Sequence, residues 1–265
     1  MSDSLSEQTL AEKVSAAHSV VFSELEFMGF SPESIHFFDT FPANKEERYN
    51  WWRRKSTSGD YSNQLKPEFN TLVQDIVKVI SLVDNGIEKE IKNNVGSQVI
   101  RSGPIAYRWA AIHTKSRDKR IDVQFFINLT CTGLRVGIYF GKHEIDTNPW
   151  KSFVLHMSKN KDTIFEELIR LKDIGYKFLN TTNEDFAVGS DGVEQSPSDS
   201  FQMYQHSFEK EEFGIIKKLE SDSLHGRDVL SFVLDCLVET RRMYELLQLS
   251  KFNRYKRSIS DKLSV

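Results

Sequence analysis

The stretch of residues 105–141, IAYRWAAIHTKSRDKRIDVQFFINLTCTGLRVGIYFG, carries the clearest strand pattern in the chain. Apolar side chains occupy every second position of residues 121–129, and the same alternation returns over residues 134–140. A period of two residues indicates strands that place one face on a core. Thr132 and Gly133 lie between the two runs and predict a tight turn. The two strands are therefore expected to pair as an antiparallel hairpin.

Further strands are expected on both sides of this hairpin. Residues 105–113 read as a strand that a basic loop, residues 115–120, joins to the hairpin. The alternation of Phe153, Leu155 and Met157 predicts one more strand. Predicted helices precede and follow these strands, which favours an α+β fold over a doubly wound sheet. We expect a central, mainly antiparallel sheet over about residues 98–157, flanked by N-terminal and C-terminal helices.

Helices are predicted wherever apolar residues recur at helical spacing. Ser31 and Pro32 mark the start of a short helix, as an N-cap followed by a proline at the first position. A short strand is expected at residues 176–179, and the last helix has the widest apolar stripe. The longer predicted helices cover residues 7–28, 44–55, 65–93, 162–174, 208–219 and 224–249.

The predicted organisation along the chain follows from these elements. An acidic stretch rich in Asn, Ser, Thr and Gly predicts a flexible loop, and the C-terminal tail is basic. The expected parts are an N-terminal helical region (1–95), the central sheet with a helix (96–180), the acidic flexible loop (181–206), the closing helices (207–250) and the basic tail (251–265).

Composition excludes several classes of protein. The net charge of −3 over 265 residues argues against a generally basic, nucleic-acid-coating surface, although it permits a local basic patch. Cys131 and Cys236 are too few for a disulfide framework or a zinc set, and both are expected to act as small buried apolar residues. No apolar run is long enough to span a membrane, and the polar, acidic N-terminus is unlike a signal peptide. A cytoplasmic protein is expected.

The second face of the predicted sheet is a candidate working surface. It is expected to present Phe126, Arg135, Tyr139 and His156, with Trp109 added if the phase of its strand permits. Aromatic rings beside arginine on an open sheet stack nucleobases. The alternative is that helices cover this face, because large exposed aromatic patches are uncommon on soluble domains.

The segment NKEERYNWWRRK, residues 44–55, is a second candidate surface. Neighbouring helical residues point about 100° apart, so one narrow buried stripe does not hold both Trp51 and Trp52. In the functional interpretation, the cations Arg53, Arg54 and Lys55 bind phosphate while an indole ring stacks on a base. In the alternative, one tryptophan packs into the core, and the cations are solvated or pair with the nearby Glu46 and Glu47.

Known catalytic motifs are absent. The run from Gly137 to Lys142 lacks the spacing and the hydroxyl of a phosphate-binding loop, and no dinucleotide fingerprint or nucleophile elbow is present. Arg108 and His113 have the spacing found in a class of helical ribonucleases, but they lie in a predicted strand. His113, His143 and His156 are more simply explained as ordinary histidines than as zinc ligands. No catalytic residue, metal site or cofactor is predicted.

Two short motifs in the sheet region carry a family resemblance. Trp109-Ala-Ala-Ile112, followed by Gly137-Ile-Tyr139, a helix and a long closing helix, resembles the N-terminal specificity domains of McrB-type modification-dependent restriction proteins. The resemblance covers about residues 95–250, and the Pro-Trp that usually begins the first motif is Arg108-Trp109 here. It implies a DNA-binding module in a prokaryotic defence or restriction system.

Together these observations predict a nucleic-acid-binding module rather than an enzyme. The first alternative is a protein-interaction or regulatory subunit that meets a partner, or a second copy of the chain, through residues 224–249. The second alternative is a metal-dependent nuclease without a recognisable motif. The residues expected to contact phosphates or bases are Trp52, Arg53, Arg54, Lys55, Trp109, Lys115, Arg117, Lys119, Arg120, Arg135 and Tyr139.

Overall fold

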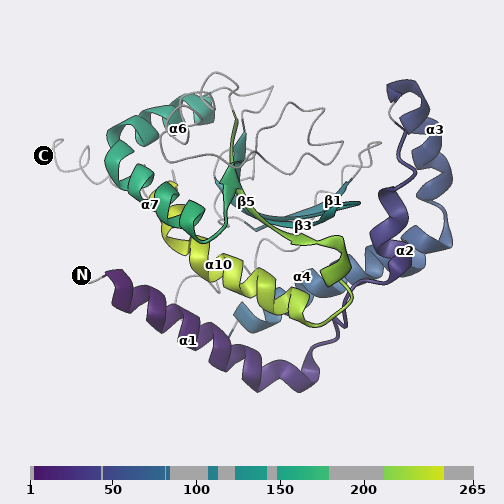
Figure 1. The fold of residues 1–265 in the computed structure, drawn as a ribbon, viewed down its shortest axis with the longest axis horizontal. Coiled ribbons are helices and arrows are strands. Elements are labelled where there is room, and N and C mark those ends of the chain that lie inside the picture. The colour runs from purple at the N-terminus through teal and green to yellow at the C-terminus, as the bar shows by residue number, and fades with distance from the viewer. Residues whose placement is uncertain are drawn as a thin grey trace, which may run out of the picture.

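A five-stranded sheet lies at the centre of the protein, in the strand order β1-β2-β3-β5-β4 (Figure 1). Each pair of neighbouring strands is antiparallel, and helices flank the sheet, which confirms the α+β class. The structure is a computed structural model that describes residues 3–42, 44–80, 82–83, 107–112, 123–141, 148–178 and 212–247. The strands are β1 (Tyr107–Ile112), β2 (Gln124–Thr130), β3 (Gly133–Gly141), β4 (Lys177–Phe178) and β5 (Glu212–Glu220).

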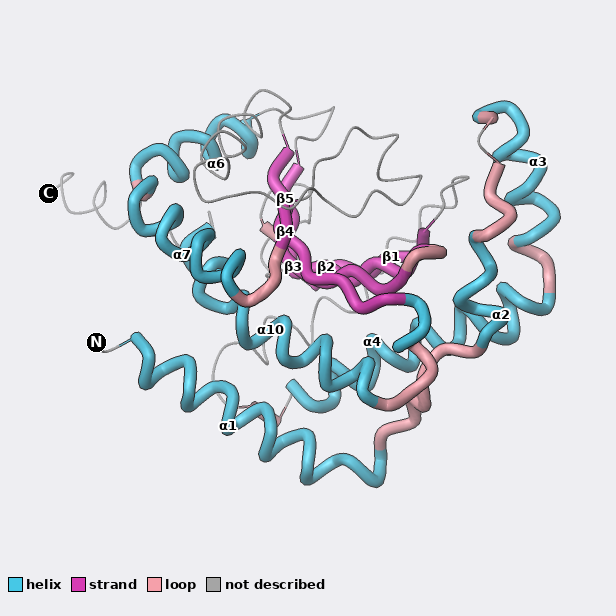
Figure 2. The backbone as a smooth tube through the Cα atoms, in the orientation of Figure 1, coloured by secondary structure: helices cyan, strands magenta, loops and turns pink. Residues whose placement is uncertain are grey.

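The helices divide into groups around this sheet. Figures 1 and 2 show α1, α4 and α10 together on one side of the sheet, α6 and α7 towards the side of β4 and β5, and α2 and α3 on the side of β1. The π-helix η3 (Asp60–Leu65) leads directly into α4. The bounds are α1 (Asp3–Val21), α2 (Pro32–Ile35), α3 (Lys45–Lys55), α4 (Lys66–Ile80), α6 (Asn148–Lys159), α7 (Lys161–Asp173) and α10 (Asp228–Leu247).

The predicted hairpin is confirmed. β2 and β3 pair with Leu129 opposite Leu134, and Cys131 and Thr132 form the turn between them. Gly133 follows the turn with a φ of 141°, a backbone conformation that residues with a side chain rarely adopt. The apolar positions of both strands face one core, because the register brings like faces together. The helix cap at Ser31, whose hydroxyl accepts from the backbone N–H of Ser34, is also confirmed.

Two predicted elements are wrong. Phe153, Leu155 and Met157 belong to α6 rather than to a strand, since Phe153 and Met157 lie one helical turn apart and are buried while Leu155 is 47% exposed. The segment predicted as a helix over residues 208–219 is β5 in its described part. Both faces of β5 are buried around Phe213, Ile215 and Ile216, so its sequence lacks the alternation that marks a half-buried strand.

The apolar stripe of α10 is used inside the protein. Among its buried side chains, Val233, Cys236 and Met243 are each 0% exposed. The stripe packs against α1, α4 and the sheet rather than facing outward. Within α10 the stripe is therefore covered by this chain, and contact with a partner through residues 224–249 stays a prediction. Within the described part of the chain, no helix is both long and apolar enough to cross a membrane.

The two cysteines are expected to differ in reactivity. Cys236 is fully buried in α10, and burial raises the pKa of its thiol to about 12, whereas Cys131 is half-buried at the hairpin turn. The thiolate is the reactive form, so a thiol reagent at pH 8 should label Cys131 and spare Cys236. Mass spectrometry of the native and the guanidinium-unfolded protein checks this, with one label expected before unfolding and both after it. Rapid labelling of native Cys236 would contradict the buried placement.

Candidate nucleic-acid interface

Helix α3 is fixed to the protein by its two tryptophans. Trp51 is 3% exposed, lies 5.1 Å from Phe41 and 5.5 Å from Phe37 between ring centroids, and donates its Nε1–H to Thr40 Oγ1 at 3.1 Å. Trp52 is half-buried and meets the Tyr61 ring edge-on at 5.3 Å. The alternative in which a tryptophan anchors the helix is therefore confirmed for Trp51. Trp52 is also largely engaged with neighbouring rings.

The charges of α3 follow the direction of its dipole. Asn44 caps the helix, with its Oδ1 accepting from the backbone N–H of Glu46 at 3.0 Å. The acidic residues lie in the first turn and the three cations lie in the last turn, where each sign is favoured by the helix dipole. The acids and Arg53 or Arg54 are thus held towards opposite ends of the helix, which explains why they do not pair.

The outward face of α3 presents two cations that form no ion pair with a described acidic residue. Arg53 and Arg54 are exposed, and within the described ranges their side chains form no ion pair. Lys55 differs, because it is half-buried with its Nζ over the Phe37 ring at 5.8 Å. Two of the three predicted cations are therefore available to a ligand.

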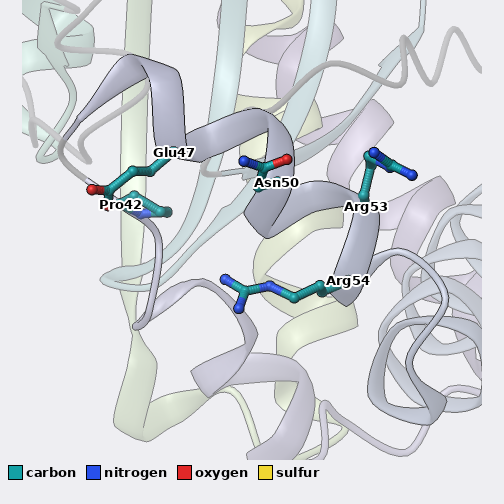
Figure 3. A pocket seen from close by; sticks show the side chains of 5 residues that line it. All are labelled: Pro42, Glu47, Asn50, Arg53 and Arg54. Atoms are coloured by element: carbon teal, nitrogen blue, oxygen red, sulfur yellow. The ribbon is translucent and has the colours of Figure 1, made fainter.

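These arginines line an open hollow of about 570 Å³ on the surface of α3 (Figure 3). The other lining residues are Pro42, Glu47 and Asn50. Figure 3 shows Asn50 between Glu47 at one end and the two arginines, whose side chains extend in different directions, at the other. The hollow is thus acidic at the end near the start of the helix and basic at the end near its last turn.

Tyr49 is a candidate contact that the sequence patterns did not single out. Its side chain is 62% exposed, and it lies four residues before Arg53, one helical turn away. The signal was present in the sequence, because Tyr49 and Trp51 lie about 200° apart around a helix. Burial of Trp51 therefore turns Tyr49 outward, and the exposed aromatic ring of α3 is a tyrosine rather than Trp52.

The second sheet face differs from the expected open platform. The register places Trp109, Asn128, Arg135 and Lys218 in one row across the sheet. Trp109 and Tyr139 are half-buried and Arg135 is 0% exposed in this structure, and the contact of these residues with nucleic acid stays a prediction. The strand alternation predicts which residues share a face, but it does not predict whether that face is covered.

The other predicted residues fall into two groups. His156 does not join the sheet face: it lies on α6, where its Nε2 is hydrogen-bonded to the backbone carbonyl of Leu246. The basic loop and the basic tail lie outside the described residues, and so do the acidic loop, His113 and His143. The loop residues concerned are Lys115, Arg117, Lys119 and Arg120.

Comparison of the chain with models of known protein families and with curated proteins finds no match. Among the residues that the structure describes, no group of three or more His, Cys, Asp or Glu side chains is arranged to hold a metal ion. The candidate site is an exposed, partly cationic helix face with one exposed aromatic ring.

Proposed function

We propose that the protein binds nucleic acid through the outward face of α3. Arg53 and Arg54 contact backbone phosphates, and Tyr49 stacks on a base. The observation that carries this proposal is the combination of two exposed arginines that form no ion pair with a described residue and an exposed tyrosine one turn away. Arginine presents its N–H donors in a planar fork that matches phosphate oxygens, and an aromatic ring stacks on any base.

The charge distribution orients the bound strand. Glu46 and Glu47 repel phosphates from the first turn of α3, while Arg53 and Arg54 attract them to the last turn. The backbone of the nucleic acid therefore lies over the C-terminal half of the helix, and Asn50 lies within reach of the sugar or base edges. Binding of this kind is sensitive to salt, because each phosphate contact releases a counterion.

Removing both arginines should weaken binding strongly. The double change Arg53→Ala and Arg54→Ala is expected to raise the Kd for a labelled single-stranded oligonucleotide at least tenfold, about 1.4 kcal/mol. Fluorescence anisotropy at several salt concentrations measures this, and the salt dependence should become shallower in the variant. Tyr49→Phe is expected to bind nearly as the native protein does and Tyr49→Ala more weakly, because stacking needs the ring and not the hydroxyl.

A matched control separates a specific surface from general electrostatics. Lys13 on α1 and Lys151 on α6 are both exposed, so replacing them with alanine removes the same number of positive charges elsewhere. This variant should retain binding. Equal weakening in the two double variants, or unchanged binding after loss of Arg53 and Arg54, would exclude α3 as the interface.

The proposal also covers which kind of nucleic acid the protein binds. The resemblance of the segments beginning at Trp109 and Gly137 to McrB-type specificity domains favours DNA and a role in a cytoplasmic restriction system. Single-stranded DNA, RNA, and duplex DNA with and without base modification should therefore be compared in the same anisotropy assay. Tighter binding of modified duplex DNA would support the restriction role, and a preference for RNA would contradict it.

A further inference from the structure

A buried arginine lies where η3, α4 and β1 meet. Arg108 on β1 is 4% exposed. Its Nη1 donates to Tyr61 Oη at 3.0 Å and its Nη2 donates to Asn70 Oδ1 at 2.9 Å. The guanidinium also lies over two rings, 5.3 Å from the centroid of Phe69 and 5.7 Å from that of Tyr61. The side chain is thus held in one orientation by contacts from two other elements, η3 and α4.

The charge of Arg108 has no acidic counterpart among the described residues. Both of its hydrogen-bond acceptors are neutral, and no carboxylate pairs with it in the described ranges. Burial lowers the pKa of the guanidinium, with Tyr61 acting against that effect, but an arginine keeps its proton in proteins. A buried, unpaired charge is strongly unfavourable, and the two aromatic faces offset only part of that cost.

These two hydrogen bonds use only some of the N–H donors of Arg108. Of the five N–H donors of an arginine, two are used in the bonds above, which leaves three. One of these is the buried Nε–H, which has no acceptor among the described residues. Because Tyr61 Oη accepts from Arg108, its own proton is free to be donated in another direction. A positive charge with unused donors and an adjacent hydroxyl donor is the arrangement that binds an oxyanion.

We propose that the junction of η3, α4 and β1 is a binding site for a small oxyanion, phosphate in chemistry, held by Arg108 and Tyr61. The near-complete burial of Arg108 limits the ligand to a free ion or a single terminal phosphate group rather than the backbone of a polymer. The π-helix supports this assignment, because such irregular turns occur frequently at functional sites.

This site goes beyond the proposed nucleic-acid surface and does not depend on it. Arg53 and Arg54 lie on the outward face of α3, whereas Arg108 lies beneath η3 on a strand. The two regions are neighbours in the fold, since the Tyr61 ring meets the Trp52 ring on α3. An experiment that excludes nucleic-acid binding at α3 therefore does not exclude the oxyanion site, and the reverse also holds.

Thermal melting of the full chain in inorganic phosphate tests the inference. At constant ionic strength set with sodium chloride, the Tm should rise with the logarithm of the phosphate concentration above the low millimolar range, by about 4 °C at roughly ten times the Kd. General salt effects on stability need higher concentrations and do not depend on Arg108. A nucleoside 5′-monophosphate is the second probe, and a rise at lower concentration than with phosphate would identify the ligand as a nucleotide. A flat Tm with both probes would overturn the proposal.

Variants assign the effect to this junction. Arg108→Met keeps the apolar stem and removes the charge, so the phosphate-dependent rise should disappear. If that variant does not fold, Tyr61→Phe decides, because it keeps the ring and removes one donor. About ten times more phosphate should then be needed for the same rise in Tm. The Arg53→Ala, Arg54→Ala variant should keep the native response. An unchanged phosphate response in Arg108→Met, or in Tyr61→Phe where only that variant folds, would show that the arginine has a structural role alone.

Discussion

Replacing Asp75 with alanine is expected to lower the free energy of unfolding by about 4 kcal/mol. Asp75 lies on α4 and is 4% exposed, and its Oδ2 accepts the backbone N–H groups of Glu26 at 2.9 Å and Phe27 at 2.7 Å. Its loss leaves two backbone donors without an acceptor, one of them buried, and each unmet donor costs about 1–3 kcal/mol. Since a domain is stable by only about 5–15 kcal/mol, this single carboxylate is a large part of the total.

Urea denaturation followed by circular dichroism measures this difference. Asp75→Asn retains an acceptor oxygen at the same place and loses only the charge, so its destabilisation should be about half that of Asp75→Ala. Asp173→Ala is the matched control, because Asp173 is exposed at the end of α7. Its effect should stay within about 0.5 kcal/mol. A similar small effect of Asp75→Ala would show that the segment after α1 is held by packing alone.

The contacts of Asp75 also explain where α1 ends. A helix is predicted from the sequence over residues 7–28, but α1 ends at Val21, and a short 3-10 turn (Phe22–Glu24) follows. The backbone N–H groups of Glu26 and Phe27 bind the carboxylate of a residue 49 and 48 positions later in the chain. Local spacing of apolar residues contains no information on such a long-range contact.

The elements that were predicted correctly are those with local causes. The β2–β3 hairpin follows from alternation on both sides of a two-residue turn, and α2 and α3 begin at capping side chains within the segment itself. β5 was missed because its apolar residues are buried on both faces, which removes the period of two. Its place between β3 and β4 depends on the whole sheet.

In the candidate site, too, the properties with a local cause follow from the sequence, and those that depend on distant segments do not. The charge order along α3 and the burial of one tryptophan are local properties, and both follow from the sequence. The burial of Arg135 and the surroundings of Arg108 depend on segments distant in the chain. Arg108, for example, bonds to residues 47 and 38 positions earlier. The sequence therefore predicts the chemical character of the surface better than it predicts which cations reach solvent.

Replacing Gly137 with alanine is expected to destabilise the protein by about 3 kcal/mol, because the centre of the sheet has no room for a side chain. Gly137 lies in β3, opposite Phe126 on β2 and Ile216 on β5. A Cβ atom at this position would lie 2.0 Å from the carbonyl oxygen of Ile215 and 2.9 Å from its carbonyl carbon. Both are backbone atoms, so relief requires β3 and β5 to move apart.

The shape of the sheet shows why a glycine is needed there. Figures 1 and 2 show β5 bending along its length, and Ile216 is near the middle of that strand. Glycine within a strand permits the close backbone approach that such a bend produces. Separating the strands would weaken a pairing that runs from Gly133 opposite Glu220 to Gly141 opposite Glu212.

Gly59→Ala is the matched control for this substitution. Gly59 has φ −59° and ψ −36°, and the nearest atom to an added Cβ is Asn63 Nδ2 at 3.5 Å. This change should be neutral or should stabilise the protein by up to about 1 kcal/mol, since alanine restricts the unfolded chain. Urea denaturation of both variants provides the comparison. If Gly137→Ala were as stable as Gly59→Ala, the close approach of β3 to β5 would not be a feature of the folded protein, and the bend of β5 would need another cause.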